Sequence, residues 1–446
     1  MKPRMHLAID VSWTNVETTW REAGARVDRH YPDIGLFEDI ARVAERGLFD
    51  MIFAGDSSGI PNTWRNSIDD AVRYGVAWPR LDMSPWIAAM SRVTSHIGFG
   101  LTYATTFMHP FYVARLLNSL DHLTNGRIAF NVVTSQRKAD AQNYGFDVLM
   151  EHDLRYDRMD EFIDVCRALW ASVEHDAFIW DRQTGLVADP AKVHEINYAG
   201  RFFKVKGPLS VPPSPQGSPV LIQAGGSARG MRAAARFVDH IFGGRMPIPM
   251  MAKQREQIDA ALRAEGRDAD KVGIIWATPI IVGETESEAK AMKERLIKQV
   301  PREAVGVWLS YNTGFDMATL PPRFSLRELN ERIVAANASP VGFVGMLAQT
   351  YGEDGEISLD EFLDHGLKAA TGYGSTMAGT ATQIADYLEE RFEGSGSRGG
   401  FMIRHSQADP IGMLYNIVDL LVPELQRRGR FRTAYTGRTL RENLVS

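Results

Sequence analysis

Short apolar runs alternate with longer amphipathic segments along most of the chain. A run of four to eight apolar residues between turn residues indicates a buried strand, and apolar positions three or four apart indicate a helix. The pattern predicts eight strands, at residues 5–10, 49–55, 97–104, 128–135, 220–225, 240–244, 273–283 and 400–404. Amphipathic helices such as "GLFEDIARVAERG" and "MAKQREQIDAALRAEG" lie between them. Eight βα units without a second strand-rich region predict an α/β fold, a TIM-type (β/α)8 barrel, rather than an open doubly wound sheet.

Two long stretches interrupt the βα pattern. Residues 174–219 are polar and rich in proline, and residues 298–370 form a second insertion before the last two helices. Insertions of this length in a compact barrel are usually lids or subunit contacts. We therefore expect a single domain over residues 1–446, with insertions at about 174–219 and 298–370 and a C-terminal arm from about residue 428.

Composition and charge narrow the choice of partners. The chain has 446 residues, a hydrophobic content of 44%, a charged content of 24% and a formal net charge of −5, as in a globular protein. This charge gives no general reason to expect a nucleic acid or an anionic membrane as partner. The exception is the arginine-rich segment "QRRGRFRTAYTGRTLREN" near the C-terminus. We interpret it as a solvated tail or a subunit-packing arm rather than a nucleic-acid patch.

The cysteine count and the N-terminus bear on location. With one cysteine, Cys166, a disulfide within the chain is impossible, and its helical setting predicts a buried thiol. The N-terminal "MKPRMHLAID" lacks the apolar core of a signal peptide, and no run approaches the length of a membrane span. We expect a cytoplasmic protein with no membrane partner.

A TIM-type barrel carries its active site at the C-terminal ends of the strands. The polar residues that follow the predicted strands are therefore the first to consider. They are Asp56 after the second strand, Thr102 to Thr106 on and after the third, Thr134 and Ser135 after the fourth, and Ser227 after the fifth.

The segment "QAGGSARGMRAAA", residues 223–235, predicts a phosphate site. It has neither the Gly-Lys-Ser/Thr of a Walker loop nor the spacing of a dinucleotide fingerprint. Its glycines allow close approach of the backbone, and the helix that follows presents free N–H groups at its N-terminus. A single phosphate fits better than a pyrophosphate. The alternative is a plain turn in which Ser227 caps the helix.

A second polar motif is "EHDLRYDRMDEF", residues 151–162. His152 and Tyr156 stand four apart and would share one face if the helix begins early enough. Such a pair could hold phosphate oxygens or a polar edge of a cofactor, and the alternative is a surface pair with its hydrogen bonds already satisfied.

Several long segments resemble one family. "TTFMHPFYVARLLNSLDHLTNGRIAFNVVTS", "RYDRMDEFIDVCRALWAS", "GTATQIADYLEERF" and the closing "VDLLVPELQRRGRFRTAYTGRTLREN" are similar to the bacterial-luciferase-like superfamily. Within it the chain resembles the nitrilotriacetate and dibenzothiophene-sulfone monooxygenase type, and the closing segment is specific to that subfamily. The resemblance covers almost the whole chain and implies the oxygenase component of a two-component FMN-dependent monooxygenase.

The resemblance also implies a set of flavin contacts. They fall on Asp56 after strand 2, Thr102 on strand 3, Ser135 in the "VTS" motif, the pair His152 and Tyr156, and Gly226 with Ser227 in the phosphate loop. The phosphate is then the 5′-phosphate of FMN, with Arg229 either adding charge or pointing into solvent.

The chemistry implied by the resemblance uses reduced FMN and O2 to oxygenate a small organic substrate containing sulfur, nitrogen or halogen. A separate NAD(P)H:flavin reductase would supply the flavin, and a homodimer or homotetramer is expected. The sequence identifies no indispensable acid or base, and His152 is a candidate for a proton-transfer role. No metal site is expected, because no cluster of ligand residues stands on the first strand.

Three other functions stay open at this point. A deazaflavin-dependent hydride-transfer oxidoreductase would use the same fold, although the closing segment argues against it. A metal-dependent barrel hydrolase lacks its ligands, and a non-catalytic flavin-binding protein is not excluded.

Two stretches depart from the family pattern. The "NVETTWREAG" segment lacks the histidine that usually precedes Trp20–Arg21, and the segment after strand 2 supplies Trp64, Trp78, Met83 and Trp86. Both stretches are expected to border the substrate side of the flavin. Packing of a lid or of a subunit contact is the alternative for these large side chains.

Overall fold

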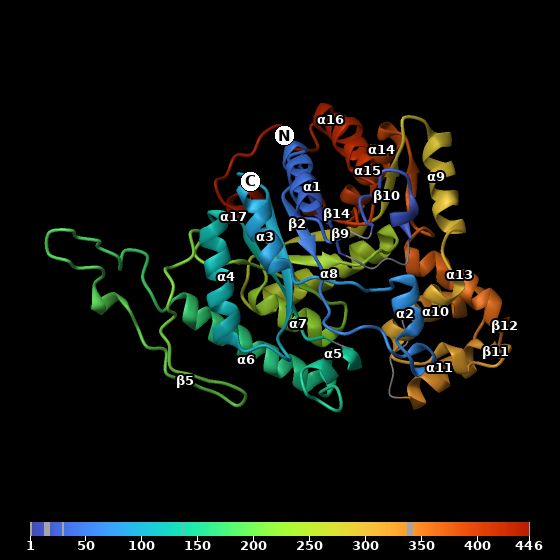
Figure 1. Ribbon diagram of the computed structural model, residues 1–446, viewed down its shortest axis with the longest axis horizontal. Helices are drawn as coiled ribbons and strands as arrows, with labels where there is room; N and C mark the ends of the chain where they lie inside the picture. Colours follow the sequence, from blue (N-terminus) through green and yellow to red (C-terminus); the bar gives the residue numbers. More distant parts are fainter. Residues whose placement is uncertain (1, 13–17, 29–30, 136, 337–341, 446) are drawn as a thin grey trace.

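Eight parallel strands form a closed barrel at the centre of the molecule (Figure 1). The computed structural model describes residues 2–12, 18–28, 31–135, 137–336 and 342–445. Around the barrel the strands are β1 (His6–Asp10), β2 (Met51–Ala54), β3 (Gly98–Ala104), β4 (Ile128–Val133), β7 (Val220–Ala224), β8 (His240–Gly243), β9 (Gly273–Thr278) and β14 (Gly399–Arg404). The predicted TIM-type barrel is confirmed, and each of the eight predicted segments contains one of its strands.

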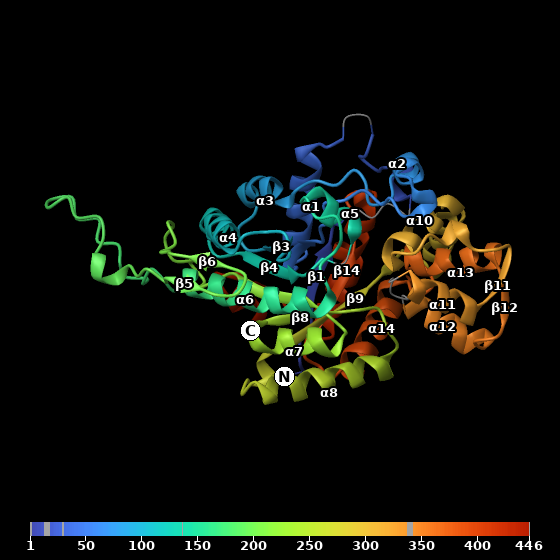
Figure 2. The ribbon, with the colours of Figure 1, turned by 90° about the horizontal axis from the view of Figure 1, so that it is seen from below.

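Helices surround the barrel and bury their apolar faces against it (Figures 1 and 2). Capping residues mark some of their ends: α4, for example, starts with Pro110 after the N-cap His109 and stops at Asn125, whose φ is 56°. The surrounding helices are α1 (Ile34–Arg46), α3 (Met83–Arg92), α4 (Pro110–Thr124), α6 (His152–Trp170), α7 (Ala228–Phe237), α8 (Ile248–Ala264), α14 (Ala381–Gly394), α15 (Ile411–Asn416) and α16 (Val422–Arg427). Helix α9 (Glu286–Lys298) packs instead on β10 (Ile280–Val282) and β13 (Met377–Gly379), outside the barrel. Cys166 lies on the buried face of α6, as expected.

The predicted strand at 273–283 is two strands. β9 stays in the barrel, whereas β10 (Ile280–Val282) pairs in parallel with β13 (Met377–Gly379) outside it. Pro279 stands between them. Proline has no N–H to donate to a strand ladder, so the barrel pairing ends there.

The C-terminal arm closes the N-terminal end of the barrel. Leu440 and Leu444 of α17 (Leu440–Val445) pack among the apolar side chains inside the barrel, such as Ala8 and Ile222. At Gly98 a Cβ atom would come within 2.6 Å of Leu440, so β3 needs glycine there. The arm is therefore part of the barrel core.

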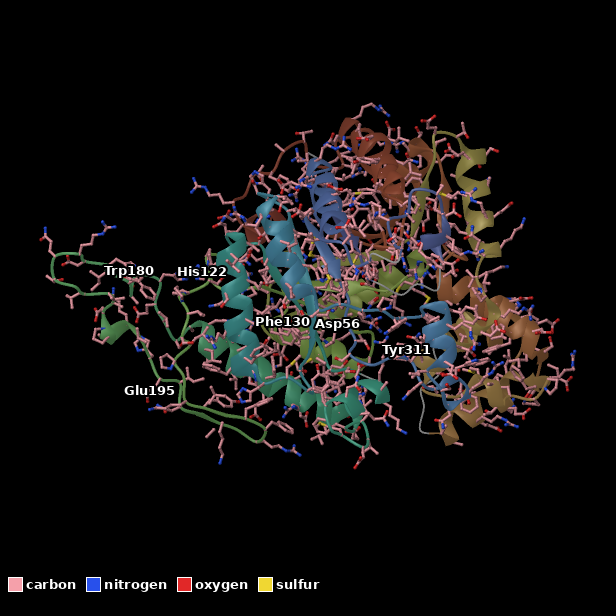
Figure 3. All side chains as sticks on the ribbon, viewed as in Figure 1. Asp56, His122, Phe130, Trp180, Glu195 and Tyr311 are labelled. Atoms are coloured by element: carbon pink, nitrogen blue, oxygen red, sulfur yellow. The ribbon has the colours of Figure 1, made fainter. Side chains whose placement is uncertain are left out.

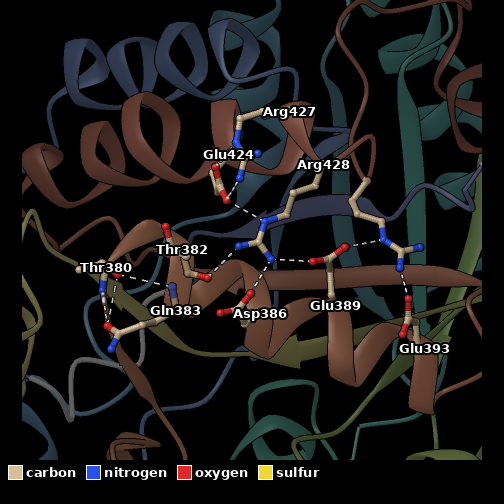
Figure 4. A network of polar contacts seen from close by, with 10 residues as sticks. Thr380, Thr382, Gln383, Asp386, Glu389, Glu393, Glu424, Arg427 and Arg428 are labelled. Carbon is tan, nitrogen blue, oxygen red and sulfur yellow. Dashed lines mark hydrogen bonds and ion pairs between the residues drawn. The ribbon is translucent and has the colours of Figure 1, made fainter.

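The arginines of this arm hold it to its own barrel. Arg428 bonds Asp386 and Glu389, each at 2.6 Å, and Arg430 bonds Glu389 at 2.6 Å (Figure 4). Arg432 is buried against Asp50. The expectation of a solvated tail is wrong for these residues, because an arginine-rich segment looks the same in sequence whether its carboxylate partners are near or absent. Packing of the arm against a second subunit stays a prediction.

The insertion at 298–370 is a helical subdomain beside the barrel (Figure 2). It contains α10 (Arg302–Thr313), α11 (Leu326–Ala335), α12 (Gly342–Tyr351) and α13 (Leu359–Thr371), with a small antiparallel pair, β11 (Arg323–Ser325) and β12 (Glu356–Ser358). Its side chains form a hydrophobic core separate from that of the barrel. Trp64 and the short helix α2 (Asp69–Tyr74), which follow β2, belong to this second core.

The insertion at 174–219 begins as an extended arm that projects away from the barrel (Figures 1 and 2). Its regular structure comprises β5 (Tyr198–Ala199) and β6 (Lys204–Val205), which pair antiparallel, and a short 3-10 helix at Pro190–Lys192. Trp180 stacks on Phe178 near the tip and is 66% exposed. In the described part of the chain no helix combines the length and apolarity that a membrane span requires.

Candidate functional site

A pocket opens at the C-terminal ends of β3, β4 and β7, where a barrel of this type carries its site. It encloses about 240 Å³. Figure 3 labels Asp56, one of its lining residues, near the centre of the molecule. Asp56, Thr102, Ser135 and Tyr156, four of the predicted site residues, line it together with Tyr103, Met108, Val132, Arg137, Asp140, Tyr144, Met159 and Gln223.

The strand ends supply a polar floor. Thr102 Oγ1 donates to the carbonyl oxygen of Ala54 at 3.0 Å and accepts from Asn131 Nδ2 at 3.0 Å. Within the described residues, Asn131 Oδ1 and Gln223 Oε1 are buried without a hydrogen-bond partner. Buried acceptors are rarely left unpaired in a folded protein, so a ligand with N–H or O–H groups would suit this floor.

Asp56 follows β2 and lies at the side of the pocket. Burial raises the pKa of its carboxyl, Arg80 and the Ser57 amide counteract the rise, and the charges of Asp82 and Asp140 add to it. Its Oδ1 accepts from the Ser57 amide at 2.7 Å. A carboxyl group with a raised pKa in a concave site is a typical functional group.

Asp140 organises the loops at the mouth of the pocket. Its Oδ1 accepts from Ser57 Oγ at 2.7 Å and from the Gly59 amide at 2.8 Å, and its Oδ2 accepts from Ser135 Oγ at 2.7 Å. Asp140 is buried on α5 (Lys138–Asn143). One carboxylate thus ties the loop after β2 to the loop after β4.

Tyr311 brings the helical subdomain to the same network. Its hydroxyl lies 2.5 Å from Ser57 Oγ, and its ring faces the guanidinium of Arg137 at 4.4 Å. Figure 3 labels Tyr311, a residue of α10, on the side of the subdomain that faces Asp56. Trp64, in the same region, packs on Gly306, so this part of α10 has little freedom to shift.

Ser135 occupies a strained backbone position. Its φ is 44°, in the left-handed region that non-glycine residues seldom adopt. Its hydroxyl is held by Asp140 instead of being free. Such strain is concentrated at functional sites, where surrounding contacts maintain it.

The phosphate motif lies next to the pocket, just beyond the end of β7. Ser227 is the N-cap of α7, and its Oγ accepts from the Gly230 amide at 3.0 Å. A Cβ added at Gly230 would lie 2.9 Å from the hydroxyl oxygen of Tyr156 and 3.0 Å from Ser227 Oγ. The serine and tyrosine hydroxyls therefore converge on the first turn of α7, which needs glycine for this approach. At Gly226 an added Cβ would meet nothing within 4 Å.

His152 begins α6, so the condition for the predicted pair is met. Its ring lies 5.1 Å from that of Tyr156, and its Nδ1 is 2.7 Å from Asp153. Arg229 pairs with Asp157 and Asp160 at 3.0 and 2.8 Å. Its charge is therefore neutralised by α6 instead of pointing into solvent or standing free for a phosphate.

Three predicted site residues lie just outside the pocket lining: His152, Gly226 and Ser227. They are connected to it through Tyr156, which lines the pocket and lies against Ser227 and Gly230. Thr105 and Thr106 are buried and donate to the carbonyl oxygens of Val133 and Thr134, so they tie β3 to β4.

The large side chains expected to border the substrate side of the flavin do not gather at the pocket. Trp64 is buried in the core of the helical subdomain, and its indole N–H donates to Asp70 at 3.1 Å. Trp64 therefore packs within an insertion, as in the alternative to a substrate contact. Trp86 stacks on Phe37 of α1 at 4.2 Å, and Met83 is buried beside them. Trp78 is exposed. The expected position of the missing histidine, just before Trp20, falls partly outside the described residues.

Sequence reasoning missed Asp140, Arg137 and Tyr311. Asp140 stands close after a strand, a position that signals a site residue in a barrel, but it lies beyond the polar residues that directly follow β4. Tyr311 had no local signal, since it lies on an ordinary amphipathic helix of the insertion.

Residues 12–399 match the family model described as luciferase-like monooxygenase. The dibenzothiophene-sulfone monooxygenase of Rhodococcus erythropolis (strain XP) is 37% identical, over 99% of this chain and 96% of that protein. Nitrilotriacetate monooxygenase component A of Aminobacter aminovorans is 34% identical, over 95% and 92%. The solved structure of riboflavin lyase (RcaE) with modified FMN and riboflavin superposes with a TM-score of 0.86 at 30% identity, over 99% of this chain and 96% of that one.

Proposed function

The chain belongs to the luciferase-like monooxygenase family and is a monooxygenase, and from this premise we propose that it uses reduced FMN and O2 to oxygenate a small organic substrate. The substrate would contain sulfur, nitrogen or halogen, as the sulfone and amine relatives suggest. One observation carries the proposal. A phosphate cradle at Ser227 adjoins a polar pocket of buried, unpaired acceptors.

The cradle suits the 5′-phosphate of FMN. The first amides of α7 have no partner within the helix, and a helix N-terminus attracts anions. The Tyr156 hydroxyl makes no hydrogen bond within the described part of the chain, and Ser227 Oγ accepts one while keeping its proton to donate. These groups can hold one phosphate, and the chain offers no comparable second cradle for a pyrophosphate in this loop.

The pocket suits the ring of the flavin. Gln223 lines the pocket and offers a buried acceptor for a ring N–H group, while Asp56, Thr102 and Ser135 supply further polar contacts. Met108, Val132 and Met159 form apolar parts of the wall. When bound, reduced FMN supplies the electrons that activate O2 for transfer of one oxygen atom. The protein's part is to orient flavin and substrate and to keep water out.

His152 suits a phosphate contact better than proton transfer at the ring. It neighbours Tyr156 at 5.1 Å, at the end of the pocket where the helix N-terminus lies. We therefore include it among the proposed flavin contacts with Gly226, and name no residue as the catalytic acid or base. His152→Ala should weaken FMN binding and leave turnover at saturating FMN largely unchanged.

Other components complete the proposed system. The relatives named component A, and subunits A and B of pristinamycin IIA synthase, act as parts of multi-component enzymes. By analogy, a separate NAD(P)H:flavin reductase would supply reduced FMN to this chain. We also propose that the chain forms a homodimer or homotetramer. A deazaflavin-dependent hydride transfer gains no support from relatives that are named monooxygenases.

Fluorescence titration with FMN, oxidised and then anaerobically reduced, tests the proposal. The reduced form should bind more tightly, and Ser227→Ala should weaken binding of both forms by about tenfold, the loss of one charge-assisted hydrogen bond. Ser119→Ala is the matched control, since Ser119 is a helix hydroxyl on the outer surface that bonds only the carbonyl of Arg115. Riboflavin, which lacks the phosphate, should bind both serine variants alike.

Oxygen uptake with a flavin reductase then tests the reaction. Uptake that increases on adding a sulfone, sulfide or amine, with one oxygen atom in the product, would support the monooxygenase proposed here. Absence of FMN binding in both redox states would contradict the assignment of this cofactor.

A further inference from the structure

The pocket contains a guanidinium without an anionic partner. Arg137 lines the pocket, and its Nε is buried without a hydrogen-bond partner. Across the residues that the structure describes, its side chain forms no ion pair, and its contact is with the face of the Tyr311 ring at 4.4 Å. Arg137 is half-buried, and a partly desolvated guanidinium is normally paired, because an unpaired charge is costly where water is excluded.

The acidic groups nearby do not neutralise Arg137. Asp140 stands three residues further along, but its two oxygens accept from Ser57, Gly59 and Ser135. Asp56 Oδ1 accepts from the Ser57 amide, and Arg80 donates to the Ser57 carbonyl at 3.2 Å. Both oxygens of Asp140 therefore have their own donors, as does Oδ1 of Asp56, and within the described residues no ion pair joins either carboxylate to Arg137.

Tyr311 fixes the guanidinium in place. A cation held over an aromatic ring keeps its N–H groups directed outward around the edge of the guanidinium plane. Tyr311 is itself held through its hydroxyl by Ser57. Arg137 is thus a preorganised, planar donor, the geometry that binds a carboxylate or sulfonate through two parallel hydrogen bonds.

An aromatic wall lies at the other end of α5, whose N-cap is Arg137 and whose C-cap is Tyr144. Tyr144 lines the pocket and stacks on Phe107 with ring centroids 4.9 Å apart and planes 6° apart, and Phe146 packs on Phe107 at 5.8 Å. Tyr144 and Phe146 are 38% and 41% exposed, so this wall has surface left to bury. Such a wall suits an apolar or aromatic body.

We propose that the substrate is an organic acid, with a carboxylate or sulfonate bound by Arg137 and an apolar body against Tyr144. This inference rests on the proposed function for the identity of the site, and it adds the chemical class of the substrate. The phosphate of the flavin is a less suitable partner for Arg137, because the cradle at Ser227 begins α7 after β7, whereas α5 is held to the loop after β2.

Binding of benzoate and of its neutral isostere benzamide, measured by calorimetry on the protein with and without FMN, tests the proposal. FMN in excess fills the phosphate cradle, so that benzoate cannot bind there instead. In the wild-type protein benzoate should bind at least about tenfold more tightly than benzamide, the range of one charge-assisted pair. Arg137→Gln should reduce benzoate binding to the level of benzamide and leave benzamide unchanged, and Arg137→Lys should retain part of the preference. Benzenesulfonate should behave as benzoate does.

Other outcomes would overturn the assignment. Equal binding of benzoate and benzamide to the wild-type protein, no benzoate binding up to about 20 mM, or an unchanged preference in Arg137→Gln would each do so. If Arg137→Gln instead weakens FMN but not riboflavin, Arg137 binds the flavin phosphate and the substrate class is wrong. A protein that binds benzoate through Arg137 but never binds FMN would leave the inference standing and remove the proposed cofactor.

Discussion

The hydroxyl of Tyr311 lies 2.5 Å from the Oγ of Ser57, a residue 254 positions earlier in the chain. Through this contact the helical subdomain is joined to the loop that carries Asp56, and through Asp140 to the loop that carries Ser135. Three segments far apart in the sequence thus share one hydrogen-bond network at the pocket. The subdomain therefore supports, from outside the pocket, the loops that line the site.

Tyr311→Phe should weaken FMN binding in the pocket without unfolding the subdomain. The ring that carries Arg137 is retained, while the hydrogen bond to Ser57, worth about 1 kcal/mol, is lost. We expect FMN affinity to fall by about fivefold and a larger share of O2 to appear as hydrogen peroxide, because the loops are held less firmly. The measurements are FMN titration and the ratio of peroxide to oxygenated product.

Tyr351→Phe is the matched control for this change. Tyr351 is in the same subdomain and its hydroxyl bonds His365 at 2.7 Å, away from the pocket. It should leave FMN affinity and product ratio unchanged. Equal effects of the two variants would show that the loss is one of subdomain stability rather than of positioning.

Gly230→Ala should damage the phosphate cradle selectively. The added methyl group would lie 2.9 Å from the Tyr156 hydroxyl and 3.0 Å from Ser227 Oγ, so one of the two must move. FMN affinity should fall by at least about tenfold, with a smaller loss for riboflavin, in a ligand titration. Gly226→Ala, where an added Cβ meets nothing within 4 Å, should keep the thermal midpoint of the wild-type protein.

Leu440→Ala should destabilise the whole barrel. Leu440 is completely buried and packs beneath Gly98 in the interior, so its truncation leaves a cavity costing about 2–5 kcal/mol. The midpoint of thermal unfolding should fall by about 2–5 °C, because the unfolding entropy of a chain of this length is large. Leu123→Ala is the control, because Leu123 is 62% exposed on α4 and should shift the midpoint little. A Leu440 variant as stable as the wild type would contradict the closing role of the arm.

Stability should decrease as the pH falls from about 6.5 to about 4. The pKa of His240 is lowered to about 4, chiefly by burial and also by the charges of His6 and Arg441, with Asp239 and Asp50 opposing them. The unfolded chain takes up a proton at His240 in this range and the folded chain does not, so stability is complete above the unfolded pKa and is lost below it. The loss reaches about 2 kcal/mol by pH 5. Urea unfolding at several pH values should show a shallower dependence for His240→Asn than for the wild type.

The projecting arm should mediate self-association. Trp180, Leu186 and Val187 are 66%, 54% and 50% exposed at its tip, and a two-stranded arm of this kind gains little stability alone. Replacing residues 176–191 by a short glycine linker should shift the sedimentation profile toward monomer. FMN affinity should stay the same, because none of these residues lines the pocket. An unchanged oligomeric state would assign the contact to another surface.

The sequence by itself determined the barrel strands and much of the phosphate end of the site. Strand periodicity, the N-cap at Ser227 and the spacing of His152 and Tyr156 depend on neighbours a few residues apart, and such patterns survive in any tertiary context. The resemblance of long segments to one family added the cofactor and the reaction class. Even the error at 273–283 was local, because Pro279 was visible as a strand breaker.

The tertiary structure alone decided which distant residues meet. Asp140 bonds Ser57 across 83 positions, Arg137 lies on a tyrosine of another subdomain, and the arginines of the C-terminal arm find their carboxylates on α14. A sequence shows that such groups are charged but not whether a partner stands opposite, because their energies depend on distance and burial fixed by packing elsewhere. For that reason the sequence predicted a tail where the structure has a packed arm. The sequence also could not show that the guanidinium of Arg137 lies in the pocket without an anionic partner.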